Sequence, residues 1–372
     1  MYSENVAELL KKARENKKLT QKELAEQLNL SRDTIIKLEK GTRKLSILEL
    51  KKIEQFFNIS IFDYLDNKKI ENKIKGIILA GGTGTRLYPI TEGISKQLVP
   101  IYDKPMIYYP LSVLMLAGIK DILVITTKED QSGFKRLLGN GSDFGINLSY
   151  IIQPSPDGLA QAFVLGEKFI GNNPCAMILG DNLYYGNGFE KELIKASENA
   201  LNGYATVFGY RVKDPERFGI MEVDEFNNVL SVEEKPEHPK SDIAITGLYF
   251  YPKNVSDIAK MIKPSARGEL EITSINNHYL KENKLKSSIL GDGYTWFDTG
   301  TFDSLIDASN MIRTIEKNSD NLICSPEIIG LNNKWLSIDN FSKRAKLLSK
   351  NRYGKCLLKI IERMEKNEKN RN

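Results

Sequence analysis

The sequence predicts an α/β fold with a mostly parallel sheet, preceded by a small all-α bundle. Two observations predict it: short apolar runs alternate with helical stretches from Lys75 onward, and several short helical patterns precede them. Parallel strands need a crossover connection, so this alternation predicts a sheet with helices on both faces. At 372 residues the chain is long enough for two domains. We expect domains at 1–66 and 74–372, joined by a charged linker at 67–73.

The predicted strands of the second domain are short and rich in aliphatic residues: Ile77–Ala80, Ile122–Thr126, Leu148–Ile152, Ala176–Leu179 and Ala205–Gly209. The predicted helices lie between them: Met106–Ala117, Gln131–Leu138, Leu159–Phe169 and Phe189–Glu198. Ligands of such sheets bind at the carboxyl ends of the strands. The loops that follow these strands are therefore the expected place for a functional site.

Composition narrows the class of protein. A hydrophobic share of 41% with 27% charged residues is typical of soluble globular proteins. No apolar run approaches the ~20 residues of a membrane span, and no signal-peptide pattern is found at the N-terminus. Cys175, Cys324 and Cys356 are scattered, which fits reduced thiols, and His238 and His278 are too few for histidine-based catalysis. These features predict a cytoplasmic protein that does not contact a membrane.

The first 66 residues form a pattern of short helices. These cover 4–16, Gln21–Leu28, a stretch from Ser31 to about Lys40, Ser46–Phe57 and a last turn at Ile61–Tyr64. Thr20 and Glu23 have the spacing of a capping box, Ser31 can cap the third helix, and Gly41 can end it. A tight break between the second and third helices is typical of a helix-turn-helix bundle.

The segments Leu19–Ala25 and Leu30–Gly41 closely resemble the phage-repressor-like (Cro/CI-type) helix-turn-helix family. That resemblance implies that the third helix enters the major groove of DNA and that Gln21 touches a phosphate. It also places these side chains against DNA, with Arg32 as the base reader: Ser31, Arg32, Asp33 and Lys37. Bundles of this kind also serve as interaction or oligomerisation modules, and a fused copy can be idle, so both alternatives stay open.

The stretch Lys75–Pro89 carries the clearest chemical signal of the second domain. An apolar strand runs into a loop with three glycines and Arg86, and Lys96 follows. Glycines let backbone N–H groups approach an anion, and the two cations add charge, which predicts a polyphosphate site. It is neither a Walker loop nor a Rossmann fingerprint, because Leu87 stands where the latter needs a third glycine.

The runs Gly81–Pro89, Ser95–Leu98 and Tyr102–Pro110 resemble the signature of sugar-nucleotide pyrophosphorylases, and in particular the glucose-1-phosphate thymidylyltransferase branch. The resemblance covers about 74–360 and implies a Rossmann-like nucleotidyltransferase sheet. It implies transfer of the thymidylyl group of dTTP to glucose 1-phosphate with Mg²⁺, giving dTDP-glucose and pyrophosphate. It also implies a homotetramer, a place at the start of dTDP-rhamnose biosynthesis, and feedback control at a second nucleotide site.

Carried over by position, the resemblance implies four overlapping groups of site residues. The nucleotide-binding group is Leu79, Gly81, Gly82, Thr83, Gly84, Thr85, Arg86, Gln153 and Gly158. The sugar-phosphate group is Phe218, Gly219, Glu234, Lys235, Ile245, Tyr249 and Arg267. The metal group is Asp181 and Asp298, and the catalytic residues are Arg86, Lys96, Asp181 and Lys235.

Some positions leave questions that the residues alone do not answer. Asp181 ends a strand, where a carboxylate is often only a helix cap, although a hard cation needs one or two carboxylates. Glu234 and Lys235 are neighbours in a predicted strand, so they should face opposite sides unless the chain turns at Pro236. Phe218 stands where relatives often carry Tyr.

Two alternatives to the dTTP enzyme remain. One is a transcription regulator that keeps a dead enzyme domain as a nucleotide-sugar sensor, and the other is the same chemistry with UTP. A decayed domain should have lost some of the residues that carry charge in the site, but all of them are present: Arg86, Lys96, Asp181, Lys235 and Asp298. Gln153 and Gly158 favour a pyrimidine without separating dTTP from UTP.

Overall fold

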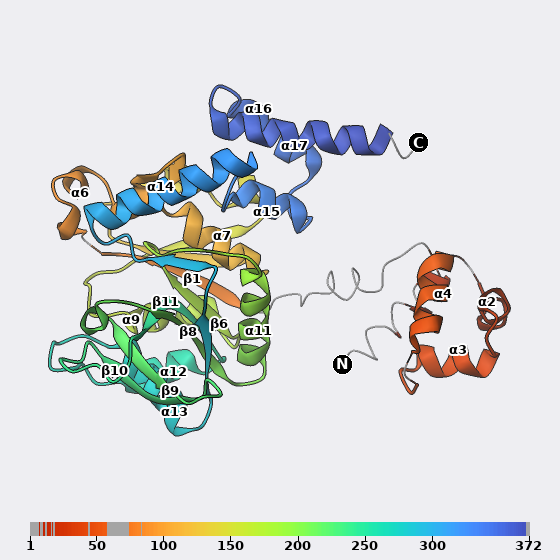
Figure 1. Ribbon diagram of the computed structural model, residues 1–372, viewed down its shortest axis with the longest axis horizontal. Helices are drawn as coiled ribbons and strands as arrows, with labels where there is room; N and C mark the ends of the chain where they lie inside the picture. Colours follow the sequence, from red (N-terminus) through yellow and green to blue (C-terminus); the bar gives the residue numbers. More distant parts are fainter. Residues whose placement is uncertain are drawn as a thin grey trace. The chain divides into compact units, whose positions relative to one another are not determined.

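The computed structural model describes residues 7, 10, 11, 13–15, 17, 19–43, 45–57, 74–82 and 84–369 (Figure 1). The chain divides into two compact units, Met1–Asn72 and Lys73–Asn372. The linker expected at 67–73 and the turn expected at Ile61–Tyr64 lie outside the described residues. The helix expected at 4–16 is described only in part, and its described residues are helical.

The first unit contains the expected helices α2 (Gln21–Leu28), α3 (Arg32–Glu39) and α4 (Ile47–Phe57). The capping box is confirmed, because Thr20 Oγ1 accepts from the Glu23 N–H at 3.2 Å and Glu23 Oε2 accepts from the Thr20 N–H at 2.7 Å. Asn29 ends α2 in the left-handed region, with a φ of 52°. This residue turns the chain sharply, so that only a short connection separates α2 from α3. The helices enclose a small apolar core: Leu10, Leu24, Ala25, Leu28, Ile35, Leu38, Ile53 and Phe57.

The second unit is built on a nine-stranded sheet with the order β10-β9-β11-β6-β1-β4-β5, in which β8 pairs with β11 and β12 pairs with β8. Its strands are β1 (Lys75–Ala80), β4 (Asp121–Thr126), β5 (Asn147–Ile152), β6 (Cys175–Leu179), β8 (Ala205–Arg211), β9 (Gly219–Val223), β10 (Val229–Glu234), β11 (Ile243–Tyr251) and β12 (Leu285–Leu290). Strands β6, β1, β4 and β5 are parallel neighbours, and β12 runs parallel to β8. Strand β11 joins these two parts by antiparallel pairing with β6 and β8. Two short ribbons complete the strands, β2 (Pro100–Ile101) with β3 (Lys104–Pro105) and β7 (Leu183–Gly186) with β13 (Tyr294–Phe297).

Helices cover both faces of the sheet (Figure 1). The longer ones are α7 (Tyr108–Leu116), α8 (Gln131–Leu138), α9 (Gln161–Leu165), α11 (Phe189–Leu201), α12 (Val255–Met261), α13 (Ile272–Lys281), α14 (Phe302–Ser319), α15 (Pro326–Asn332), α16 (Ile338–Leu347) and α17 (Arg352–Lys369). The short ones are α6 (Ile90–Gly93), α10 (Glu167–Ile170), η1 (Thr85–Leu87), η2 (Lys96–Leu98), η3 (Ser142–Phe144) and η4 (Pro215–Arg217). Because side chains alternate along β1, Ile78 packs in the core with α7 and α11, whereas Ile77 and Leu79 pack in the core with α9, α12 and α13.

The predicted fold class is confirmed, and each predicted strand lies within two residues of an observed one. One predicted helix, Leu159–Phe169, is broken at Gly166 into α9 and α10. At this residue the chain packs so closely on β1 that a Cβ would stand 3.1 Å from Ile77 Cδ1. Helical periodicity continues through the break, which is why the sequence predicted one helix.

A buried ion cluster joins β3 to α14 and α17. Lys104 Nζ lies 2.5 Å from Asp103 Oδ1 and 3.0 Å from Glu316 Oε1, and Arg352 Nη1 lies 2.6 Å from Glu316 Oε2. The side chains of Lys104 and Glu316 are 1% and 0% exposed. Burial acts to raise the pKa of Glu316, but the charge of Lys104, with hydrogen bonds from Ile323 and Arg352, outweighs it and the net shift is downward.

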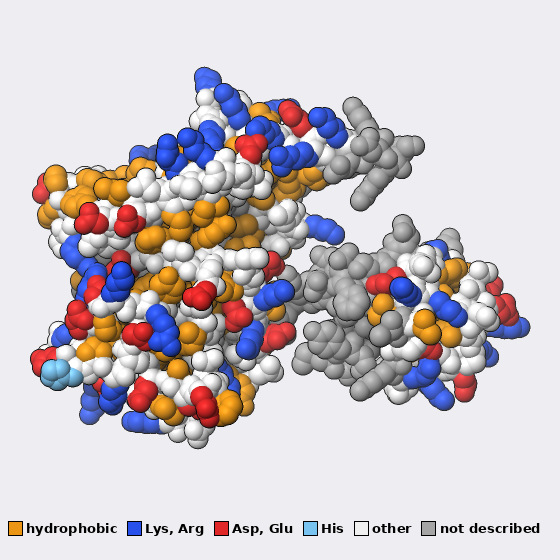
Figure 2. Space-filling view, in the orientation of Figure 1, with side chains coloured by type: hydrophobic (Ala, Val, Ile, Leu, Met, Phe, Trp, Pro, Cys, Tyr) orange, Lys and Arg blue, Asp and Glu red, His pale blue; other side chains and the backbone are white. Residues whose placement is uncertain are grey.

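On the face that Figure 2 shows, Lys and Arg side chains gather along α16 and α17, and elsewhere on the second unit acidic and basic side chains are interspersed. Within the part of the chain that the structure describes, no helix is both long and apolar enough to cross a membrane.

Candidate active site

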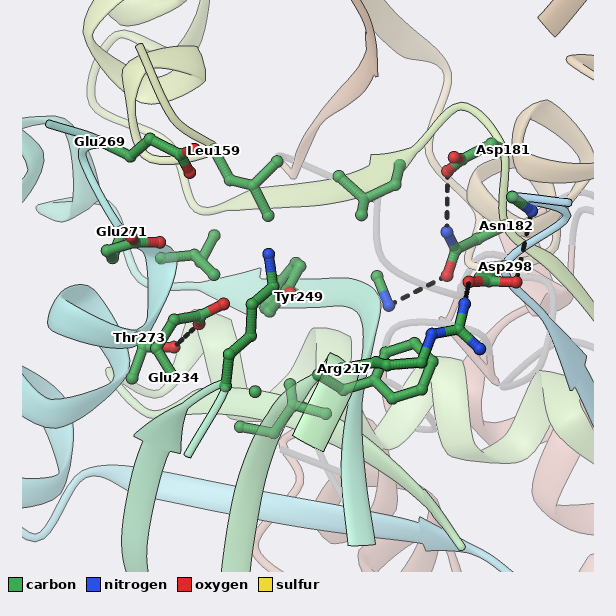
Figure 3. A pocket seen from close by; sticks show the side chains of 18 of the residues that line it. Leu159, Asp181, Asn182, Arg217, Glu234, Tyr249, Glu269, Glu271, Thr273 and Asp298 are labelled. Carbon is green, nitrogen blue, oxygen red and sulfur yellow. Dashed lines mark hydrogen bonds and ion pairs between the residues drawn. The ribbon is translucent and has the colours of Figure 1, made fainter. Parts of the chain in front are cut away.

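A pocket of about 310 Å³ opens among the loops of the second unit, beside the glycine-rich loop. It brings together Arg86, predicted for the nucleotide, and all of the residues predicted for the sugar phosphate and the metal: Asp181, Phe218, Gly219, Glu234, Lys235, Ile245, Tyr249, Arg267 and Asp298. Figure 3 shows Glu234, Glu269 and Glu271 at one end of the pocket and the two aspartates at the other. These segments are far apart in sequence, so the fold assembles the pocket.

Each of the two aspartates is paired with a basic side chain. Asp181 follows β6, and its Oδ2 lies 2.6 Å from Lys96 Nζ. Asp298 follows β13, its Oδ2 lies 3.4 Å from Arg217 Nη2 (Figure 3), and its carbonyl oxygen lies 3.4 Å from the same Lys96 Nζ. Lys96 thus touches both aspartate residues, and the two carboxylates are held at one end of the pocket with their charges balanced.

Asn182 fixes the orientation of Asp181 by a set of hydrogen bonds. Its Nδ2 donates to Asp181 Oδ1 at 3.0 Å, and its Oδ1 accepts from Trp296 Nε1 at 2.6 Å and from the Gly247 N–H at 3.1 Å. The Thr299 hydroxyl also donates to the Asp181 carbonyl at 2.5 Å. Asn182 is 3% exposed, so this amide has no freedom to turn. Asn182 was not among the predicted site residues, although an amide beside a strand-end carboxylate is a readable signal.

The glycine-rich loop follows β1, where Leu79 is buried near the strand end. Gly81 lies against Gln153: a Cβ on Gly81 would stand 2.0 Å from Gln153 Oε1. Gly84 has a φ of +63° and begins η1, which carries Thr85 and Arg86. A Cβ on Gly82 would meet open space, so its backbone is approachable, and Thr83 lies outside the described residues.

Arg86 reaches the aspartate end of the pocket from this loop. A Cβ on Gly300 would stand 3.3 Å from Arg86 Nη1 and 3.3 Å from Asp298 Oδ2, so both groups approach the same glycine. Arg86 is exposed, and no described residue forms an ion pair or hydrogen bond with its guanidinium. Its five donors are therefore available to an anion in the pocket.

The opposite end of the pocket is formed where β10 ends. The strand ends at Glu234, and Lys235 follows with a φ of +42° and donates its N–H to the Phe218 carbonyl at 3.0 Å. This left-handed residue turns the chain, so that Glu234 and Lys235 both line the pocket instead of facing opposite sides. The Thr273 hydroxyl donates to Glu234 Oε2 (Figure 3).

Aromatic side chains form the floor between the two ends. Phe218 packs on Trp296 with ring centroids 5.4 Å apart. Burial, with a smaller contribution from the nearby Glu234 charge, raises the pKa of Tyr249, so its hydroxyl stays protonated and can donate a hydrogen bond. Arg267 lies at the rim and pairs with Glu269 at 2.9 Å and Glu271 at 3.1 Å.

Gln153 and Gly158 do not line this pocket, and they lie in the loop between β5 and α9. Gly158 has a φ of +109°, and a Cβ there would stand 2.5 Å from the Leu270 carbonyl oxygen, so only glycine fits. This loop is held against the segment that carries Arg267, because Leu270 N–H donates to the Asp157 carbonyl at 2.7 Å.

In the first unit, the residues predicted to contact DNA lie at α2 and α3. Ser31, Arg32 and Lys37 are exposed, whereas Gln21 is half-buried and donates from Nε2 to Glu39 Oε2 at 2.8 Å. Lys37 Nζ lies 3.9 Å from Asp33 Oδ2 and so offsets the acidic charge on the same face.

A mostly parallel sheet whose glycine-rich loop meets strand-end carboxylates and basic side chains is the arrangement of a nucleotidyltransferase. Residues 75–315 match the family model described as nucleotidyl transferase, and residues 10–64 match the helix-turn-helix model. More specifically, the chain belongs to the glucose-1-phosphate thymidylyltransferase family. Enzymes of this kind generally use a divalent metal.

Two curated relatives illustrate the similarity. The glucose-1-phosphate thymidylyltransferase of Neisseria gonorrhoeae is 59% identical over 288 residues, which cover 77% of this chain and 99% of the relative. That of Mycobacterium tuberculosis (strain ATCC 25618 / H37Rv) is 50% identical over 290 residues, which cover 78% of this chain and 100% of the relative. The N-terminal unit is thus additional to the length that these relatives share with the chain.

Solved structures show the same fold. A Bacillus anthracis protein assigned as a glucose-1-phosphate thymidylyltransferase, in complex with sucrose, is 42% identical with a TM-score of 0.60, and the match covers 64% of this chain and 95% of that one. A UDP-glucose pyrophosphorylase complexed with UDP-glucose is 25% identical with a TM-score of 0.58, and the match covers 65% of this chain and 99% of that one.

Proposed function

We propose that the second unit transfers the thymidylyl group of dTTP to glucose 1-phosphate, giving dTDP-glucose and pyrophosphate. The observation that carries the proposal is the two-ended pocket, in which Lys235 and Glu234 face two aspartates beside the glycine-rich loop. Such a pocket can hold a sugar phosphate between the two ends and present it to a nucleotide on the loop. The identity of the curated relatives supports dTTP as the nucleotide.

Positioning and charge neutralisation supply the catalysis. The phosphate oxygen of glucose 1-phosphate attacks the α-phosphorus of dTTP in line, and pyrophosphate leaves. Arg86 and the glycine-rich loop hold the triphosphate, and Arg86 stabilises the departing pyrophosphate. Lys96 offsets charge near the reacting phosphates, and Lys235 with Arg267 binds the sugar phosphate. Glu234 accepts hydrogen bonds from sugar hydroxyls.

Mg²⁺ is the proposed metal, and Asp181 and Asp298 would hold it. Mg²⁺ prefers one or two carboxylates together with substrate phosphates. The donor set fits, because the two carboxylates lie together at one end of the pocket and substrate phosphates can supply further oxygen ligands. When bound, such a cation polarises the α-phosphate and neutralises its charge. Lys96 and Arg217 balance the same carboxylates from the protein side.

The resemblance and the cysteine pattern support four further assignments. We propose a cytoplasmic enzyme, since Cys175, Cys324 and Cys356 are all free thiols. We also propose a homotetramer that supplies dTDP-glucose to dTDP-rhamnose formation and is controlled by a downstream dTDP-sugar at a second nucleotide site.

Pyrophosphate release tests the proposed reaction. Full-length protein with glucose 1-phosphate and Mg²⁺ should release pyrophosphate with dTTP, and UTP is measured in parallel. Faster turnover with UTP would replace the nucleotide in the proposal. No release with either nucleotide would contradict the reaction and favour the sensor alternative, in which only binding of dTDP-sugars would be detected.

We further propose that the first unit binds DNA through α3. Ser31, Arg32 and Lys37 are exposed around this helix, and the family match supports its role as the recognition helix. In this arrangement Arg32, at the first position of α3, reads a base edge, and Gln21 contacts a phosphate.

The substitution Arg32→Ala should weaken binding to a selected DNA site by about tenfold, because a bidentate base contact is worth about 1–3 kcal/mol. Sites are first recovered with the full-length protein from a random-sequence duplex library, and affinity is then measured by fluorescence anisotropy. Lys51→Ala, which removes an exposed charge from α4, is the matched control and should change affinity by less than about twofold. If the library yields no enriched sequence, the unit is an interaction module or an idle remnant.

A further inference from the structure

A chain of polar side chains lies beside the glycine-rich loop and outside the pocket described above. The Ser155 hydroxyl donates to Asp157 Oδ2 at 2.6 Å, and Gln161 Nε2 donates to the same oxygen at 2.7 Å. Gln153 Nε2 in turn donates to Gln161 Oε1 at 2.6 Å. Gln153 and Gln161 are 9% and 8% exposed, so the contact between these two amides is shielded from water, whereas Asp157 at the end of the chain is exposed.

The carboxylate at one end fixes the direction of every hydrogen bond in this chain. An ionised Asp157 can only accept, so Gln161 must turn its Nε2 toward it. Gln161 then presents Oε1 on its other side, and Gln153 must donate to that oxygen. The amide of Gln153 is thereby oriented, and the atom that it leaves unused is Oε1, a hydrogen-bond acceptor.

That acceptor faces the glycine-rich loop. Gln153 Oε1 lies so close to Gly81 that a Cβ there would stand 2.0 Å away, and no described residue donates a hydrogen bond to it. The Gly158 N–H lies five residues after Gln153 in the loop between β5 and α9, and it likewise finds no acceptor among the described residues. The loop between β5 and α9 therefore offers one acceptor and one donor where the proposed nucleotide binds.

This pair of groups complements one class of base. Thymine and uracil carry an N3–H donor beside the O4 acceptor, and cytosine carries the reverse, a bare N3 acceptor beside the N4 amine donor. Thymine or uracil can thus satisfy both Gln153 Oε1 and the Gly158 N–H. Cytosine would oppose acceptor to acceptor and donor to donor, which leaves buried polar groups unpaired.

We propose that Asp157 and Gln161 are positioning residues that select thymine and uracil against cytosine by fixing the hydrogen-bond direction of Gln153. The inference rests on the proposed function, with the base of the nucleotide placed beside Gln153 as the resemblance implies. Neither residue touches the substrate, and each acts through the orientation of the Gln153 amide. The relay does not distinguish dTTP from dUTP, because both bases present the same edge.

The test is the ratio of kcat/KM for dTTP to that for dCTP in the full-length protein. The unsubstituted chain should prefer dTTP by at least ~10²-fold, as sites that hydrogen-bond a substrate group do. Asp157→Asn replaces an acceptor-only group by one that can also donate, so the ratio should fall about tenfold, the equivalent of one hydrogen bond. Gln161→Lys places a donor-only group in the chain, which would turn Gln153 Oε1 away from the base and lower the ratio further.

Asp130→Asn is the matched control. Asp130 also follows a strand of the sheet and accepts from a neighbouring hydroxyl, that of Thr127, at 2.9 Å, but it is outside the relay. Its ratio should stay within about twofold of the unsubstituted chain. A purely structural effect of the relay substitutions would lower both nucleotides together and leave the ratio unchanged.

The outcomes separate the relay from the proposed reaction. Unchanged ratios in both relay variants that still turn over dTTP would overturn the relay and leave the reaction intact. If the unsubstituted protein releases no pyrophosphate, the reaction fails instead, and titration calorimetry of dTTP and dCTP binding to the same variants gives the ratio without turnover. If Gln161→Lys does not fold, Asp157→Asn decides alone, because the Asp157 side chain is exposed and its loss opens no cavity.

Discussion

Replacing Asp181 by Asn should lower kcat for pyrophosphate release by about 10²-fold or more while the fold remains intact. Asp181 carries one of the two carboxylates at the aspartate end of the pocket, and it is oriented there by Asn182 and Thr299. The loss of one preorganised charge costs about 3 kcal/mol of transition-state stabilisation. Asn keeps the shape of the side chain, so the thermal unfolding midpoint should change little. The rate is measured at saturating dTTP and glucose 1-phosphate.

Asp121→Asn provides the matched control for this substitution. Asp121 pairs with Lys75 at 2.6 Å, the same distance as the pair between Asp181 and Lys96, but it lies at the start of β4 instead of the end of a strand. Its kcat should stay within about twofold of the unsubstituted chain. Full activity in Asp181→Asn would remove this carboxylate from the mechanism.

Lys104→Met should destabilise the second unit by about 3 kcal/mol, because removal of one partner leaves buried carboxylates with too little compensation. Glu316 is fully buried, and Lys104 Nζ donates to it at 3.0 Å and to Asp103 at 2.5 Å. Arg352 still pairs with Glu316, but it is partly exposed and replaces only part of the lost charge. Met fills a similar volume, so the effect reports charge more than packing.

Urea unfolding followed by tryptophan fluorescence measures this free energy. Trp296 and Trp335 are the only tryptophans of the chain, and both lie in the second unit, so the signal reports that unit by itself. Lys75→Met removes a partner from the partly exposed pair with Asp121 and should cost less than about 1 kcal/mol. Equal losses in the two variants would show that burial does not govern the energy of the cluster.

The sequence predicts those parts of the site that depend on local pattern. The glycine-rich loop requires a strand, glycines and nearby cations, and all of these are adjacent in the chain. The strand-end position of Asp181 was likewise readable, because an apolar run leads directly to it. The helix-turn-helix unit was readable in the same way, from a capping box at Thr20 and from apolar positions at helical spacing.

Contacts between distant segments could not be predicted in this way. Arg217 has no local pattern that marks it, and it enters the site only because η4 lies close to Asp298. Trp296 supports Asn182 across more than a hundred residues. The turn at Lys235 depends on one backbone dihedral angle, which strand periodicity does not encode.

The charges that line the pocket nearly cancel. Among the described lining residues four are basic and five are acidic: Arg86, Arg217, Lys235 and Arg267, and Asp181, Glu234, Glu269, Glu271 and Asp298. A nearly neutral cavity exerts little long-range attraction on a polyanion, so electrostatic steering contributes little to the rate of encounter. The same balance applies to the polyanionic product, which no strong field draws back once it has left. Binding energy in this enzyme is thus concentrated in short-range contacts, which form only after the substrate has entered the pocket.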